Sequence, residues 1–400
     1  MKLALAFPSL LLLAVAALAT AQDGPPPESR ADFRYSFAAI DDATFDSSLQ
    51  PPLPASAAAL KAPSVTYFQN QLLLEPSFTL RYRSRWSVAA SMVGRAETFH
   101  GLSASDFNLP PGNTAAASAL NIALETYIGT HTQLRVKEIY AGLSAGDFDF
   151  TAGRKIVRWG TGYAFSPAGV LDPPRTPANP TDRLNFNQGR DMVKADWVHG
   201  PHALSLAWSS ATLAPGGSGL RDTTAFRYNV LAHGFDTSMI AGNDRGGDSF
   251  GGLTFTRVFG QAWEMHGEAV WREQEAILLG AKCTTARGVS FIGEFYTPPN
   301  IPYYRDSTIT ALDGRQYYGF LRVSKSRLRE LPGWKQWDIS AAMVTNMNDH
   351  SYTVILDATR RFGGHVSSYL HVETPQGKKS SDYGAIPYTA ATSAGVKFQL

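Results

Sequence analysis

Apolar and polar side chains alternate along most of this chain, from about residue 64 to Leu400. The alternating segments are about ten residues long, and turn residues such as Gly, Asp, Asn and Pro separate them. Successive side chains of a β-strand point to opposite faces. The pattern therefore predicts a long series of strands, each with one apolar and one polar face.

The segment 261–272 shows this alternation most clearly. Its apolar face carries Trp263, Met265, Ala269 and Trp271, and its polar face carries Glu264, His266, Glu268 and Arg272. At about 3.3 Å per residue and a tilt of about 40°, the two tryptophans lie about 20 Å apart along a membrane normal. Because that spacing is close to the height of an outer-membrane apolar band, we expect Trp263 and Trp271 to belong to its aromatic girdles.

Charged side chains gather on the polar faces of several predicted strands. Such faces would be costly to bury in a soluble core, and they suit a water-filled lumen. We expect a basic ladder on one strand, with residues of opposite sign across the lumen, so that a transverse field orients polar solutes. The pore-lining candidates are Arg81, Arg83 and Arg85 for the ladder, and Lys194, Asp196, Glu264, His266, Glu268, Asp357 and Arg361 elsewhere.

Turn positions support a barrel. Short turns are expected at 145–147, 199–201, 259–260 and 362–364, and longer connections at about 100–132, 158–189, 213–223, 298–314 and 375–387. Bacterial barrels keep short turns on the periplasmic side and long loops outside, which fits a periplasmic C-terminus. The prediction is an all-β protein, a transmembrane antiparallel up-and-down β-barrel of about 16 strands (about 14–18, because residues 64–99 divide ambiguously).

The N-terminal region differs from the rest. Residues 1–21 have a basic start, an apolar run and a small-residue ending at Ala19-Thr20-Ala21, as a cleavable signal peptide does. Residues 22–63 are rich in Pro and Ala and lack clear alternation, so they are expected to form a periplasmic tail or a small plug segment. Residues 64–400 are then the barrel.

Composition refines the picture slightly. Aromatic residues make up 12% of the chain, charged residues 18%, and there are 35 glycines, as alternating lipid-facing and water-facing strands would give. The net charge of +2 gives no reason to expect a nucleic-acid partner. Cys283 is the only cysteine, so an internal disulfide is excluded.

The segment 153–191 is the most distinctive. A strand ends near Val157, and a proline-rich connection without strand pattern follows. Long structured loops are usually functional, so we expect this loop to fold into the lumen or over its mouth and constrict it. An ordinary surface loop is the alternative. The constriction candidates are Arg154, Arg158, Trp159, Asp172, Arg175, Asp182 and Arg183.

The same segment carries a resemblance. Gly153-Arg154-Lys155-Ile156-Val157-Arg158-Trp159-Gly160, followed by Gly169-Val170-Leu171-Asp172-Pro173, resembles a widespread group of porin-like outer-membrane proteins with a G-R-x-x-V-x-W-G strand end. The run Glu264-Met265-His266-Gly267-Glu268 is also similar to that group. The resemblance implies a porin-type barrel and names no substrate. A more distant likeness is to alginate-export-type porins.

Two stretches imitate catalytic motifs. Gly142-Leu143-Ser144-Ala145-Gly146 fits G-x-S-x-G, but that motif needs a strand-to-helix turn, and a hairpin is expected here. Glu264, His266 and Glu268 alternate onto one face about 6.6 Å apart, which is wide for one metal ion. We therefore expect no catalytic residue, no cofactor and no metal.

The pattern as a whole favours an outer-membrane channel for passive or weakly selective diffusion of small hydrophilic solutes. A surface anchor or adhesin with a closed lumen is the first alternative, and a barrel-embedded hydrolase is the second. The expected partners are the lipid bilayer, the solute, and the barrel assembly machinery, which would read the last strand with Phe398 near its end. The oligomeric state is left open.

Overall fold

The computed structural model describes residues 31–49, 65–82, 85–100, 121–127, 130–172, 189–210, 222–244, 248–272, 275–298, 316–328, 334–378, 381–384 and 389–399. The expected signal peptide lies outside these residues, as do 22–30 and 50–64 of the expected tail or plug. No helix in the described part of the chain is long and apolar enough to cross a membrane.

The described residues form nineteen strands in one antiparallel sheet. The first ten are β1 (Ala31–Leu49), β2 (Val65–Tyr82), β3 (Trp86–His100), β4 (Asn121–Tyr127), β5 (Thr130–Ala145), β6 (Phe148–Lys155), β7 (Arg190–His199), β8 (His202–Ser209), β9 (Thr223–Ala232) and β10 (Phe235–Asp244). The others are β11 (Ser249–Phe259), β12 (Trp263–Trp271), β13 (Glu275–Thr284), β14 (Val289–Thr297), β15 (Tyr318–Lys325), β16 (Trp337–Asn346), β17 (Ser351–Phe362), β18 (Val366–Gln376) and β19 (Ala390–Gln399).

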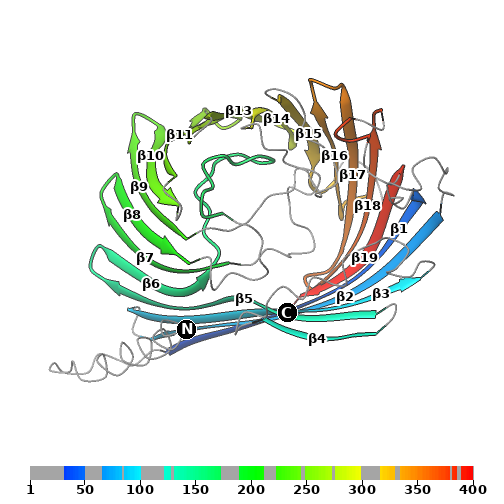
Figure 1. The fold of residues 1–400 in the computed structure, drawn as a ribbon, viewed down its shortest axis with the longest axis horizontal. Coiled ribbons are helices and arrows are strands. Elements are labelled where there is room, and N and C mark those ends of the chain that lie inside the picture. The colour runs from blue at the N-terminus through cyan, green and yellow to red at the C-terminus, as the bar shows by residue number, and fades with distance from the viewer. Residues whose placement is uncertain are drawn as a thin grey trace.

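The sheet closes on itself into the ring seen in Figure 1, because β1 pairs with both β19 and β2. The short strand β4 pairs with β5 alone, and β3 also pairs with β5. Apart from β4, the other 18 of these nineteen strands form the wall. The predicted transmembrane up-and-down barrel is confirmed, with a strand number at the upper end of the predicted range.

The expected boundary at residue 64 is wrong. Residues Ala31–Leu49 form β1, which pairs along its length with β2 and closes the ring against β19. This stretch has weak alternation and proline-rich flanks, so its sequence resembles a tail. Backbone pairing with β19 and β2 stabilises this strand although its own sequence pattern is weak. Without β1 the sheet would keep two open edges.

The outer face of the wall is apolar. On β12, Trp263 (54% exposed) and Trp271 (46% exposed) point outward at opposite ends of the strand, as predicted, with Met265 between them. A band of exposed aliphatic side chains continues around the barrel, including Leu206, Met239, Leu253, Leu279, Leu321, Leu356 and Leu370. An apolar band with aromatic residues at its edges is the exterior that a bilayer solvates.

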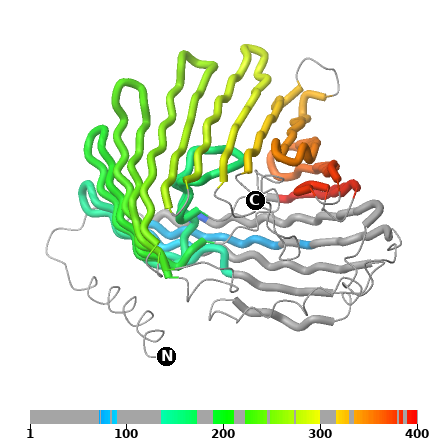
Figure 2. Tube along the Cα trace, turned by 45° about the horizontal axis from the view of Figure 1, so that its top comes forward, coloured from blue at the N-terminus to red at the C-terminus, as the bar shows by residue number. Residues whose placement is uncertain are grey.

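The predicted short turns all lie at one end of the barrel, and Figure 2 shows coloured hairpin turns along that rim. Gly146, Gly200, Gly260 and Gly363 occupy these turns, with φ values of 62°, 57°, 59° and 72°. Left-handed backbone of this kind favours glycine. The strand ends that the predicted longer connections join lie at the opposite end, which we call the loop end, as distinct from the turn end.

The orientation of β16 gives a direct test of the two faces. Ala341 lies on the outer face beside Val323 and Leu356, and neighbouring Ser340 lies on the inner face beside Asp357. Ala341→Arg should lower the free energy of unfolding by about 2–4 kcal/mol, because the charge enters the lipid band. Ser340→Arg should cost less than about 1 kcal/mol. Equal losses in a lipid refolding titration would contradict the assignment of the faces.

Candidate functional site

After β6 ends at Lys155, the chain leaves the wall and residues 156–172 run inside the ring (Figure 1). The base of this inner loop is braced by an ion pair. Arg154 is fully buried, and its Nε and Nη2 donate to the two carboxylate oxygens of Asp191 on β7, at 3.0 and 2.7 Å. Its Nη1 donates to the Val136 carbonyl at 3.1 Å. The planar fork of arginine suits this bidentate geometry.

Two glutamates on the wall hold the backbone of the inner loop. Glu268 on β12 accepts from the backbone N–H groups of Thr161, Gly162 (2.8 Å) and Ala168 (2.8 Å). Glu268 also accepts from the Thr161 hydroxyl at 3.1 Å.

Glu294 on β14 accepts from the next three backbone N–H groups along the loop. These belong to Tyr163, Ala164 (2.8 Å) and Phe165 (3.3 Å). A segment without strand or helix pairing needs such partners when it is buried. The two carboxylates therefore take the place of a hydrogen-bond ladder.

Small residues allow the loop to turn this tightly. A Cβ on Gly162 would lie 2.0 Å from the Phe165 carbonyl oxygen and 2.5 Å from a methyl group of Leu278. A Cβ on Gly160 would lie 1.6 Å from the Ser166 hydroxyl. Asp172 closes the loop on itself, because its carboxylate accepts from the Trp159 backbone N–H at 2.7 Å.

Apolar packing fixes the loop from both ends. Val157, Trp159, Ala168, Val170 and Leu171 pack against inner-face side chains of β7 to β12. These wall partners are Met192, Ala207, Ala225, Ile240, Phe250 and Val270.

The middle of the loop packs against a second apolar cluster on the inner face of β13 to β17. Phe165 stacks on Tyr296, with ring centroids 4.7 Å apart. Under the loop, the inner face of the wall therefore carries large apolar clusters beside the two glutamates, whereas the sequence analysis expected polar side chains throughout.

Tyr163 connects the loop to a polar group on the wall. Its hydroxyl donates to Glu264 at 3.0 Å and accepts from Lys282 at 3.0 Å. Its ring meets His266 edge to face at 5.4 Å, and His266 Nε2 lies 3.0 Å from Glu294. The buried imidazole occupies space that Gly280 leaves open, since a Cβ there would lie 2.1 Å from His266 Nε2.

A second segment turns inward between β18 and β19. Tyr383 is 1% exposed and belongs to the same apolar cluster as Phe165. Asp382 accepts from the Tyr318 hydroxyl at 2.6 Å, and the Tyr383 backbone N–H donates to the Ser351 hydroxyl at 3.1 Å. Within the part of the chain that the structure describes, the loop end thus holds two inturned segments.

The constriction candidates divide into three groups. Arg158 is exposed on the inner loop, and Trp159 packs the loop base against the wall. Arg154 and Asp172 are buried in structural bonds, so the expectation that they are presented to the lumen is wrong. Arg175, Asp182 and Arg183 lie outside the described residues.

The pore-lining candidates also fall into groups, some covered by the loop and some paired with a charged neighbour. Glu264, His266 and Glu268 are on the inner face, but the loop covers His266 and Glu268, which are 1% and 2% exposed. Lys194 and Asp196 pair at 2.6 Å, and Asp357 pairs with His371 at 2.7 Å.

The prediction that Arg81, Arg83 and Arg85 form a basic ladder on one strand is wrong. β2 ends at Tyr82, Arg85 lies in the turn before β3, and Arg83 lies outside the described residues. Arg81 alone stands on β2.

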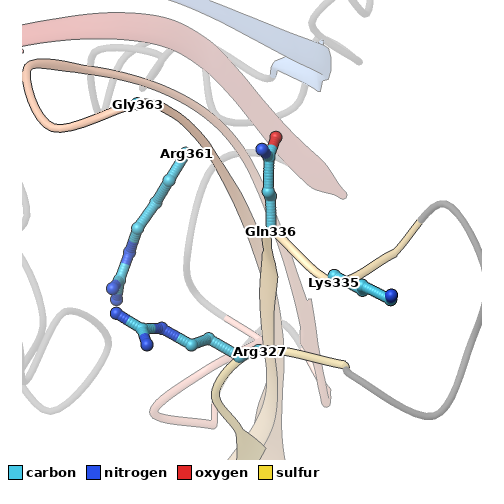
Figure 3. Close-up of a pocket in the computed structure, with 5 residues that line it drawn as sticks. All are labelled: Arg327, Lys335, Gln336, Arg361 and Gly363. Carbon is cyan, nitrogen blue, oxygen red and sulfur yellow. The ribbon is translucent and has the colours of Figure 1, made fainter.

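A basic pocket lies at the turn end, with a volume of about 460 Å³. It is lined by Arg327, Lys335, Gln336, Arg361 and Gly363, and Figure 3 shows the guanidinium groups of Arg327 and Arg361 facing each other. Arg361 is also paired with Asp338. Arg361, the last of the pore-lining candidates, therefore lies among other charged side chains at the turn end.

Neither catalytic resemblance forms a site. Ser144 donates to Asp149 within the β5–β6 hairpin, so the predicted strand-to-strand setting is confirmed. Within the described residues, no three His, Cys, Asp or Glu side chains gather where they could hold a metal ion.

Glu294 and the apolar inner wall were not predicted. A signal for the wall was available, since segments such as EAILLG and YGFL are apolar on both faces. Glu294 carries no local signal that separates it from the other inner-face carboxylates.

The anchoring of the loop can be measured residue by residue. Glu268→Gln keeps one acceptor oxygen, so its amide group cannot accept from Ala168 while it serves Thr161 and Gly162. We expect amide exchange at Ala168 to be about thirtyfold faster, as loss of about 2 kcal/mol predicts. Glu264→Gln, on the same face, should leave Ala168 unchanged, because Glu264 contacts the Tyr163 hydroxyl. Equal exchange rates in both variants would show that Glu268 does not hold the loop.

Comparisons with known proteins bear on the fold. No family model matches the chain, and no curated protein matches it. Among solved structures, OccK7 (OpdD) of Pseudomonas aeruginosa has a TM-score of 0.54 at 10% identity, covering 92% of this chain and 99% of that one. OccAB4 of Acinetobacter baumannii has a TM-score of 0.56 at 7% identity, covering 94% and 98%.

A third similar structure is the outer membrane protein OpdK of Pseudomonas aeruginosa with vanillate. Its TM-score is 0.56 at 8% identity, covering 92% of this chain and 98% of that one. At such identities the likeness concerns the fold. The chain has the barrel architecture of these proteins over nearly its whole length.

Proposed function

We propose that the protein is an outer-membrane channel for passive or weakly selective diffusion of small hydrophilic solutes. The observation that carries this proposal is a loop anchored inside an 18-strand wall. Barrels of about eight strands fill their interior with side chains, whereas barrels of about 16–18 strands leave an aqueous channel. A fixed loop inside such a wall narrows the path without needing to close it.

The structural neighbours support the same proposal. OpdK is described as an outer membrane protein, and one of its structures contains vanillate, a small aromatic carboxylate. The outer location of this chain is inferred from that likeness, from the apolar exterior and from the expected signal peptide. The finer resemblance to proteins with the G-R-x-x-V-x-W-G strand end, and the role of β19 in binding the assembly machinery, remain predictions.

Selectivity would arise from two different levels of the lumen. At the loop end, the exposed Arg158 and the Tyr163–Lys282–Glu264 group stand on or beside the inner loop. At the turn end, Arg361 and its neighbours surround the basic pocket. A solute would meet the constriction first from outside and the charged group second.

Planar-bilayer recording tests the channel directly. The full chain should give discrete conductance steps, because an open lumen passes ions. A closed surface anchor or adhesin would give none, and a hydrolase would reveal itself by cleavage of lipid or peptide instead. Vanillate uptake into liposomes that carry the protein provides a second readout with a defined small solute.

The inner loop should limit the current. Replacing residues 163–185 with a short Gly-rich turn should raise single-channel conductance, since it removes residues 163–172, which run inside the ring. Gly162→Val is a milder companion, because its side chain would push the loop off Leu278 without shortening the chain. Folding of each variant is checked by heat-dependent gel mobility. Unchanged conductance in both folded variants would contradict the constriction.

A further inference from the structure

The sequence Thr-Arg-x-Phe-Gly occurs twice, each time at the turn end of a strand. Thr256-Arg257-Val258-Phe259-Gly260 ends β11, and Thr359-Arg360-Arg361-Phe362-Gly363 ends β17. The arginine and the phenylalanine share the outer face in both copies, because Leu253 and Leu356 on the same faces are exposed outward. These two arginines are therefore charged groups on the lipid-facing side of the barrel.

Each arginine packs against two aromatic rings. The guanidinium of Arg257 lies 4.3 Å from the ring centroid of Phe235, directly opposite on β10, and 4.6 Å from that of Phe259. The guanidinium of Arg360 lies 5.8 Å from Trp337, directly opposite on β16, and 4.8 Å from Phe362. The same construction thus stands at two places on the rim, and we call each one an arginine clamp.

The rings pack against the guanidinium through their π systems and do not pair with the hydrogen-bond donors of its terminal nitrogens. Among the described residues, neither arginine has a carboxylate or carbonyl acceptor, and Arg360 Nε is buried without a hydrogen-bond partner. A planar guanidinium matches the oxygens of a phosphate group. An arginine fixed in place by stacking also loses little entropy when it binds an anion.

An apolar hollow adjoins the Arg360 clamp. It has a volume of about 520 Å³ and lies over β14 to β18, lined mainly by outer-face side chains. Prominent among these are Val323, Ile339, Ala341, Leu356, Ala358 and Leu370. Ala358 is two residues from Arg360 on the same face, so the hollow begins beside the clamp and runs toward the middle of the apolar band.

We propose that the Arg360 clamp and this hollow form a binding site for one phospholipid, with the phosphate on the guanidinium and an acyl chain in the hollow. The Arg257 clamp binds a phospholipid phosphate in the same way. The proposal rests on the proposed function to the extent that it places the wall in a bilayer. The clamps stand at the turn end, so the lipid belongs to the leaflet on that side of the membrane.

Comparison of Arg360 with its neighbour Arg361 can separate a specific lipid site from a surface charge that the interface merely tolerates. An outward arginine costs little at a membrane interface, where its head group reaches polar lipid. Neighbouring Arg361 has the same charge at the same height, but it lies on the inner face and pairs with Asp338. The two arginines therefore form a matched pair for experiment.

The test counts phospholipids on the purified full chain in dodecyl maltoside by native mass spectrometry, during titration with dioleoylphosphatidylglycerol. Arg360→Gln and Arg257→Gln should each weaken the tightest binding about fivefold, as expected for one basic residue at a lipid surface. Arg361→Gln should leave it unchanged, and Arg360→Lys should retain most of it. Ala358→Phe, which fills the hollow, should weaken binding without changing charge.

Three results would overturn the site. Equal weakening by Arg361→Gln would mean diffuse attraction, and equal binding of dioleoylglycerol would mean that the phosphate is not recognised. Unchanged binding in Ala358→Phe together with displacement by inorganic phosphate would mean a free-anion site with no lipid. Bilayer conductance of the same variants is recorded separately. A chain that retains this lipid binding but shows no conductance would defeat the channel and leave the lipid site standing.

Discussion

The need to satisfy the backbone of a chain segment inside the barrel is the constraint on which the loop end depends. Residues 161–168 have no strand partner, yet they are buried or half-buried against the wall, where an unpaired N–H group is costly. Glu268 and Glu294 accept from six of these N–H groups between them. Carboxylates suit this task because each has several acceptor positions and no donor. The wall therefore determines the path of the loop, and the loop in turn covers the wall.

This mutual dependence explains why the inner face changes character along the barrel. Near the loop end, apolar clusters line the inner wall from β7 to β17 beside the two anchoring glutamates, because the inturned segments shield this surface from water. Toward the turn end, inner-face groups are paired with one another, as in Lys194 with Asp196 and Asp357 with His371. An apolar surface facing an empty aqueous lumen would be unfavourable. The inner loop is thus part of the core as well as part of the path.

Sequence pattern predicted the features that follow from alternation alone. The faces of β12, the two outward tryptophans and the short glycine turns all follow from local geometry, which a single strand carries by itself. Strand β1 escaped prediction because its own alternation is weak and its place in the sheet depends on pairing with β2 and with β19, which is far away in sequence. The inward path of the loop was anticipated from its prolines and its lack of strand pattern. The anchoring role of Glu294 was not predicted, because the local sequence around an inner-face carboxylate does not show whether the loop will lie over it.

The wall is covered by an inner loop at the loop end and closed by tight turns at the turn end, and this difference gives the two ends different roles. At the loop end, specificity can reside in the side chains that the inner loop carries, since the wall behind them is hidden. At the turn end, tight glycine turns leave the strand ends bare, so the wall itself meets both solvent and lipid. Arg360 and Arg361 illustrate the consequence: adjacent arginines face opposite sides, one stacked on aromatic rings outside and one paired with Asp338 inside. Because alternation separates them completely, the lipid contacts and the luminal charge at this end can change independently of each other.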